Sequence, residues 1–226
     1  MNTILDYLKR LSEHNNRAWF NEHKAEYLEC KLRFDKFVED VVLAIRSFDS
    51  SIGELSASDC TWRIYRDTRF SADKRPYKTH FGGYVAPTGK KGPYSGYYFQ
   101  IGVAPENSFL AVGNYYTEPK VLKILREDID MDQAQTLEAA LNQARGFSLD
   151  TEQCLKRVPR GFDADRPYSE YFKFKNFCLI KPVDEAYVAS SDFKEKMVND
   201  FMTTKPFLDF INRAIAYSLD EDLRQR

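Results

Sequence analysis

The sequence has few of the residues that build metal centres and disulfide-rich folds. Its 226 residues include four cysteines and three histidines, with no C-x-x-C pair. Cysteines this sparse are typical of a reduced intracellular protein, so we expect a cytoplasmic location. The histidines lack the spacing of metal ligands, so we expect no metal. These residues are His14, His23, His80, Cys30, Cys60, Cys154 and Cys178.

Several functional motifs are also missing. The chain has no G-x-G-x-x-G pattern for dinucleotides and no G-x-S-x-G pattern for serine hydrolases. We therefore expect no cofactor. The start, MNTILDYLKR, has no cationic region followed by an apolar one, and no apolar run approaches membrane-spanning length. These features predict neither a signal peptide nor a membrane partner.

The composition is that of a globular protein with a large core. Hydrophobic residues make up 43% of the chain and aromatic residues 15%. Large rings bury much area each, so this content supports a sizeable core. No long linker, repeat or low-complexity segment interrupts the chain. We therefore expect a single domain over residues 1–226, and the sequence makes no prediction of oligomeric state.

Helical periodicity dominates the N-terminal part. Apolar residues recur at helical spacing over residues 3–13 and again over 17–48. Asn15 or Asn16 can cap the start of the second stretch. That stretch predicts one long helix, or two helices broken near residues 30–34.

In the middle of the chain, apolar residues recur at every second position instead of at helical spacing. Alternation predicts strands at residues 61–66, 79–86, 96–103 and 108–113. The Pro- and Gly-rich residues 87–93 are typical of a hairpin tip. Short strands joined by short turns favour an antiparallel meander.

Helices return after the meander. Pro119 suits the first turn of one helix, and a second ends at Gly146. A strand at residues 177–181 precedes a final helix that Pro206 should kink. Together the elements predict an α+β fold, with a central, mainly antiparallel sheet flanked by N-terminal and C-terminal helices.

The most informative segment is residues 63–80, RIYRDTRFSADKRPYKTH. It holds four Arg, two Lys, two Asp and one His within eighteen residues. Guanidinium forks and ammonium groups suit phosphate and carboxylate ligands, and an imidazole exchanges protons near neutral pH. Candidate ligand-binding residues are Arg63, Arg66, Arg69, Lys74 and Lys78, joined by Arg17, Arg157 and Arg160 from elsewhere. Candidate catalytic residues are His80, Tyr65 and Asp67.

Charge is distributed unevenly along the chain. Residues 60–95 contain eight Lys/Arg against two Asp/Glu, although the formal net charge of the whole chain is −1. A basic island in an acidic body can steer an anion, whereas the overall charge argues against a globally basic nucleic-acid binder. The alternative is a structural network in which Asp67 and Asp73 pair with arginines.

Four strings resemble a known family. They are NNRAWF at 15–20, IYRDTRFSADKRPYKTHFG at 64–82, YYTEP at 115–119 and KRVPRGFDADRP at 156–167. Together they are similar to a family of bacteria and fungi that is catalogued as a domain of unknown function. The resemblance implies one intracellular domain and no particular chemistry. Relatives often carry His where this chain has Arg166, so an activity that depended on that His would differ here.

The residues support three functional hypotheses. The first is a basic, aromatic-lined pocket for a small anionic ligand; whether it belongs to an enzyme stays open at this point. The second is a nucleic-acid or protein interaction module that uses residues 63–80, 90–91 and 156–160. Nucleic acid is the less favoured partner because the rest of the chain is acidic. The third is a purely structural ion network, in which case replacing Arg66 should unfold the protein.

Overall fold

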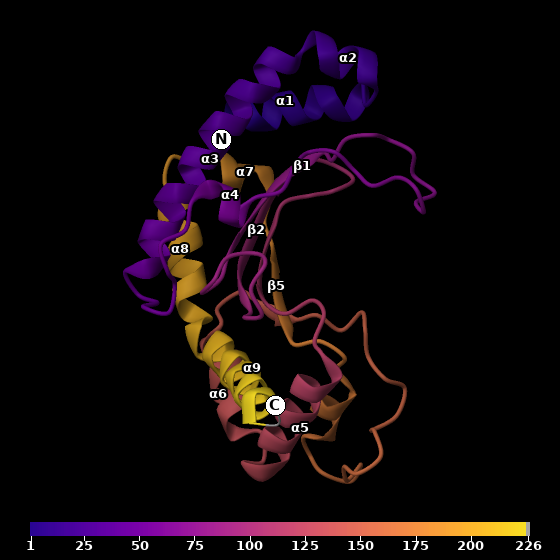
Figure 1. Ribbon diagram of the computed structural model, residues 1–226, viewed down its shortest axis with the longest axis vertical. Coiled ribbons are helices and arrows are strands. Elements are labelled where there is room, and N and C mark those ends of the chain that lie inside the picture. The colour runs from indigo at the N-terminus through magenta and orange to yellow at the C-terminus, as the bar shows by residue number, and fades with distance from the viewer. Residues whose placement is uncertain (225–226) are drawn as a thin grey trace. The chain divides into compact units, whose positions relative to one another are not determined.

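A computed structural model describes residues 1–224 and confirms the α+β class (Figure 1). Five strands form an antiparallel sheet with the order β1-β2-β3-β5-β4. They are β1 (His80–Val85), β2 (Gly96–Gly102), β3 (Phe109–Gly113), β4 (Ser148–Leu149) and β5 (Cys178–Pro182). The order β1-β2-β3 is the predicted meander, and the strands expected at residues 79–86, 96–103, 108–113 and 177–181 are confirmed.

The contacts divide the chain into two compact units. The first comprises Met1–Gly92, Tyr98–Leu110 and Pro182–Val198. The second comprises Pro93–Tyr97, Ala111–Lys181 and the described residues from Asn199 onward. The expectation of a single domain stays a prediction.

The first unit begins with three helices. These are α1 (Asn2–Glu13), α2 (Arg17–Glu22) and α3 (Lys24–Arg46). In α1 the apolar stripe predicted from the periodicity is buried, including Ile4, Leu8 and Leu11. The Asn16 side chain caps α2 by accepting a hydrogen bond from the backbone N–H of Trp19 at 3.1 Å, as expected for an N-cap residue.

The predicted break near residues 30–34 is wrong. The helical stretch is interrupted at His23, whose backbone leaves the helical conformation (φ −100°, ψ 20°), and α3 then runs for 23 residues. Cys30 and Phe34, one turn apart, both face the core, so the buried stripe is continuous there. Phe34 packs on the sheet through Phe81, with ring centroids 5.2 Å apart, and Phe99, at 5.9 Å.

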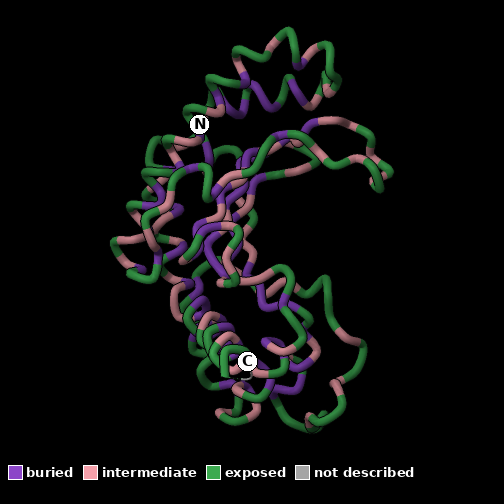
Figure 2. Tube along the Cα trace, viewed as in Figure 1, coloured by how far each residue is buried: buried purple, intermediate pink, exposed green. Residues whose placement is uncertain are grey.

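The predicted strand at 61–66 is also absent. Thr61 and Tyr65 form only isolated antiparallel bridges, to Gly83 and Tyr77. The N–H of Arg66 donates to the Pro76 carbonyl at 2.9 Å, and the N–H of Lys78 donates to the Ile64 carbonyl at 2.8 Å. Proline has no N–H to extend this ladder. The chain beyond it forms a loop, residues 66–76, that extends from the sheet in Figure 1 and has an exposed tip in Figure 2.

Three further helices lie wholly or partly in this unit. They are α4 (Ala57–Cys60), α7 (Glu185–Ala189) and α8 (Phe193–Thr203), the last of which continues into the second unit. Phe193 stacks on Phe37 of α3, with the two ring centroids 5.4 Å apart. The α7 helix begins at a capping aspartate, Asp184, which accepts from the N–H of Tyr187 at 2.7 Å.

The second unit is mainly helical. It contains α5 (Pro119–Met131), α6 (Gln135–Gln143), a 3-10 helix η1 (Ser169–Lys173) and α9 (Lys205–Arg224). Pro119 is in the first turn of α5, as predicted. The α9 helix packs against α5 and α6. The single kinked helix expected at the end of the chain is instead two helices, interrupted at Thr204 directly before Lys205 and Pro206. Proline has no N–H to continue the helical hydrogen bonds of α8.

Candidate functional site

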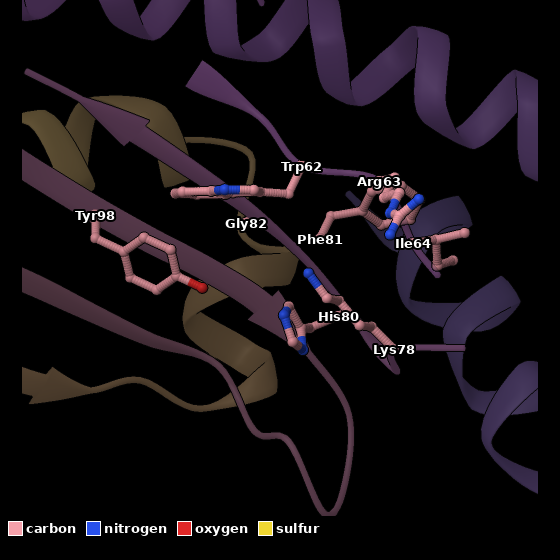
Figure 3. Close-up of a pocket in the computed structure, with 8 residues that line it drawn as sticks. All are labelled: Trp62, Arg63, Ile64, Lys78, His80, Phe81, Gly82 and Tyr98. Carbon is pink, nitrogen blue, oxygen red and sulfur yellow. The ribbon is translucent and has the colours of Figure 1, made fainter. Parts of the chain in front are cut away.

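A cavity of about 300 Å³ opens in the first unit beside the candidate segment (Figure 3). Its walls come from the chain between α4 and β1, from β1 itself and from β2. The lining residues are Trp62, Arg63, Ile64, Lys78, His80, Phe81, Gly82 and Tyr98.

A glycine and a tyrosine on neighbouring strands shape the floor. A Cβ on Gly82 would lie 2.7 Å from the Tyr98 hydroxyl oxygen, so only glycine lets the tyrosine ring lie across β1. At Gly82 the space that a side chain would occupy is filled by the protein's own tyrosine ring. Tyr98 donates a hydrogen bond to Gln100 Oε1 at 2.9 Å. Burial raises the pKa of Tyr98, so its hydroxyl stays protonated.

An exposed indole forms one wall. Trp62 is 45% exposed, an unusual state for the largest side chain in proteins. Thr61 holds the adjoining backbone through its bridge to Gly83 and through its hydroxyl, which donates to the Ala57 carbonyl at 2.9 Å. The indole is therefore supported by fixed backbone and presented to the cavity.

Two cations border the same space. Figure 3 shows the Lys78 ammonium pointing into the region between Trp62, His80 and Tyr98. Neither Lys78 nor Arg63 forms an ion pair with any carboxylate in the part of the chain that the structure describes. Burial lowers the pKa of Lys78, and the positive charges of Arg63 and Arg66 lower it further, while Glu106 opposes the shift. The cavity is therefore bordered by two cations that form no direct ion pair among the described residues, although the Glu106 carboxylate acts on Lys78 through its charge.

His80 is held in place by Glu106. Its Nδ1 lies 2.8 Å from Glu106 Oε2. The same oxygen accepts from the Thr79 N–H at 2.7 Å and the Thr79 hydroxyl at 3.0 Å. Burial by itself would raise the pKa of Glu106, but the hydrogen bonds from His80 and Thr79 outweigh it and lower this pKa to about 2. The carboxylate is thus ionised and can only accept, so Nδ1 carries a proton and Nε2 has no partner among the described residues.

Gly102 makes this arrangement possible. A Cβ there would lie 2.2 Å from the Glu106 carbonyl oxygen and 2.9 Å from Cβ of His80. A larger residue at this position would therefore push the turn after β2 away from β1. The turn is tied back to β2 because the Gln100 side-chain amide donates to the carbonyls of Glu106 and Asn107, both at 2.8 Å.

Comparison with protein families identifies the chain. Residues 3–210 match the family described as "Conserved hypothetical protein (DUF2461)". The chain belongs to this family. The match confirms the resemblance to a domain of unknown function, and it covers the cavity and part of each compact unit. No match was found among curated proteins, and none among solved structures.

Several predicted ligand-binding residues of this family member are instead engaged within the loop 66–76. Arg66 and Arg75 both pair with Asp73, with N–O distances of 2.5 and 2.6 Å. Arg69 pairs with Asp67 at 2.6 Å. The Lys74 ammonium donates to the Thr68 carbonyl at 3.0 Å. The local acids thus neutralise the charges of Arg66, Arg69 and Arg75, as the structural alternative expected, whereas Lys74, Arg63 and Lys78 have no carboxylate partner among the described residues.

The remaining candidates do not line the cavity. Tyr65 packs against Phe20 and Tyr77, with ring centroids 5.9 and 5.4 Å away. Arg17 is an exposed residue at the start of α2. Arg157 and Arg160 are exposed in a loop of the second unit, and on the hairpin tip Lys90 bonds to the Ser58 carbonyl.

Sequence reasoning missed Glu106 and Tyr98. Glu106 lies in a stretch that reads as a turn, and nothing local indicates that its carboxylate reaches back to His80. Tyr98 had a weak signal, because it stands on a strand that pairs with the glycine-containing strand 79–86. A search of the neighbouring strand for large side chains able to reach the space left by Gly82 would have included it.

The described chain carries neither a metal-type cluster nor a membrane span. Between residues 1 and 224, no three His, Cys, Asp or Glu side chains cluster in a way that could hold a metal ion. Over the same residues, no helix combines the length and apolar character needed to cross a bilayer. All four cysteines are free thiols, and burial raises the pKa of Cys30, Cys60 and Cys178.

Proposed function

We propose that the cavity binds a small ligand carrying a phosphate or carboxylate group. The observation that supports this most directly is Lys78, a partly buried cation with a lowered pKa that opens into the cavity without a carboxylate partner. Withdrawing an unpaired charge from water costs free energy, and a bound anion would recover it. Arg63 supplies a second cation and a planar fork of donors.

We further propose that His80 can exchange a proton with the bound ligand. Its Nδ1 is occupied by Glu106, so Nε2 is the nitrogen available on this ring. An imidazole held by a carboxylate is a common general acid or base. The protein could therefore be an enzyme in which Glu106 is a positioning residue. The catalytic roles of Tyr65 and Asp67, and the binding roles of the arginines outside the cavity, stay predictions.

A second candidate function is an interaction module for nucleic acid or protein. It is favoured by Phe70, which is 97% exposed at the tip of the loop 66–76, with the Arg69 guanidinium 5.9 Å from the ring centroid. Exposed aromatic rings beside cations can stack on unpaired bases. A gel-shift assay at low salt tests this function. If the protein leaves the mobility of single-stranded and duplex nucleic acid unchanged, the nucleic-acid version is excluded.

A cytoplasmic location remains part of the proposal and is supported by the free thiols.

Thermal-shift titrations with inorganic phosphate and simple carboxylates test the first proposal. Wild type should be stabilised by at least one of them. Lys78→Met should lose most of this stabilisation while keeping its own melting temperature or raising it, because the variant removes an unpaired, partly buried cation. Lys74→Met is the matched control, since Lys74 bonds within the loop outside the cavity. The proposal would be contradicted if both variants lost the same amount of anion-induced stabilisation, or if no anion raised the melting temperature of wild type.

A further inference from the structure

We infer that the ligand of this cavity carries a planar aromatic ring, which stacks on Trp62 while its anionic group reaches Lys78 and Arg63. The inference rests on the proposed function and specifies the ligand class. It comes from comparing the two tryptophans of the chain, Trp19 and Trp62.

Trp19 has stacking partners within the protein. The His23 ring stacks on it with a centroid distance of 4.0 Å and an interplanar angle of 12°. The His14 ring is stacked at 5.9 Å, and Tyr7 and the Arg10 guanidinium each lie 5.9 Å away. Aromatic faces in folded proteins commonly gain such partners.

Trp62 has no stacked partner among the described residues. Its nearest rings are Tyr98, at 6.2 Å and an angle of 59°, and Tyr84, at 6.3 Å and 40°. Both rings are tilted, so neither covers an indole face. With 45% of its surface exposed and its side chain lining the cavity, Trp62 offers a flat apolar surface to a ligand.

Lys78 and Arg63 would bind the anionic group of the same ligand. Lys78 and Arg63 line the same cavity as the indole, so a ring against Trp62 would place an attached anionic group within their reach. The volume, about 300 Å³, is at the small end of ligand sites. It suits one ring and one anionic substituent. A nucleoside monophosphate and an aromatic carboxylate share this chemistry.

Fluorescence provides the first test. In the Trp19→Phe protein, Trp62 is the only tryptophan, so its emission reports on the cavity. The probes are adenosine 5′-monophosphate against ribose 5-phosphate, and 2-naphthoate against cyclohexanecarboxylate. Each pair shares its anion and differs in the aromatic ring. We expect a ring-bearing member to quench Trp62 and to bind about tenfold more tightly than its partner. Tighter binding of adenosine 5′-monophosphate would indicate a nucleoside monophosphate as the ligand, and tighter binding of 2-naphthoate would indicate an aromatic carboxylate.

Calorimetry on Trp62→Leu in the otherwise wild-type chain gives a second, independent test. The ring-bearing probe should lose its advantage, while the ring-free anion keeps its affinity. Equal binding of both members by wild type, with no quenching of Trp62, would overturn the ring inference and leave the proposed function intact. No binding of any of the four anions would overturn both. Failure of Lys78→Met to weaken a ring-bearing probe that quenches Trp62 would overturn the assignment of the anionic group.

Discussion

His80 and Glu106 are separated by 26 positions in the chain, yet His80 Nδ1 lies 2.8 Å from Glu106 Oε2. The contact joins the first residue of β1 to the turn after β2. It fixes both the orientation of the imidazole and the charge of the carboxylate, and it gives a first prediction on acid stability.

Glu106→Gln should be less stable than wild type at neutral pH. The pKa of Glu106 is about 2 in the folded protein, against an ordinary value of 4.5. A lowered carboxyl pKa contributes stability above pH 4.5, which is lost as the pH falls through 2. After allowance for solvent screening, we expect a deficit of roughly 1–2 kcal/mol at pH 7 that closes towards pH 2. Urea unfolding of both proteins across this range measures it, and a deficit that persists at pH 2 would contradict it.

Anion binding should weaken at alkaline pH because Lys78 loses its proton. Its pKa is lowered by burial and by neighbouring cations, so the loss should begin at a lower pH than for an ordinary lysine. Lys78→Arg keeps its charge at these pH values and should retain binding further into the alkaline range. Phosphate titrations by calorimetry at a series of pH values compare the two proteins. Identical pH profiles would show that Lys78 does not hold the anion.

Alanine at two adjacent glycines should have different effects. A Cβ on Gly83 would lie 2.4 Å from Cζ of Phe99, which is fully buried, so Gly83→Ala should cost about 1–3 kcal/mol through overpacking. Gly82→Ala meets the outer end of Tyr98, which can tilt towards the cavity. It should cost less stability but weaken phosphate binding. Chemical denaturation and phosphate titration separate the two effects, and a Gly83→Ala protein as stable as wild type would refute this packing argument.

Arg66→Ala should leave the protein folded. Asp73, its partner, keeps a second ion pair with Arg75, and ion pairs this close to solvent contribute little stability. We expect a melting temperature lowered by only a few degrees in circular dichroism, with phosphate binding retained. Complete unfolding of this variant would favour the structural interpretation of the whole basic segment.

The fold class was predictable because its signals are local. Periods of two and 3.6 residues record which side of an element meets the core, and they located β1, β2, β3 and α1. Pairing is not local. Residues 61–66 alternate like a strand, but their ladder ends at Pro76, which has no N–H to donate.

The site was predictable only in part for the same reason. Counting charges shows more cations than acids within residues 63–80, but the sequence does not show which cations the local aspartates neutralise. The folded chain pairs Arg66, Arg69 and Arg75 with aspartates and leaves Arg63, Lys74 and Lys78 without a carboxylate partner among the described residues. Glu106 depends on a turn that Gly102 permits, and this is a tertiary effect that composition does not record.

The loop 66–76 has a practical consequence. Its ion pairs are internal, and its base is closed by the bridge between Tyr65 and Tyr77. Chain inserted at a surface loop whose ends are already held together adds little entropic cost. Position 70, at the exposed tip, is therefore a suitable attachment point for a dye, an affinity peptide or a surface tether. Such a label would immobilise or report on the protein without entering the cavity.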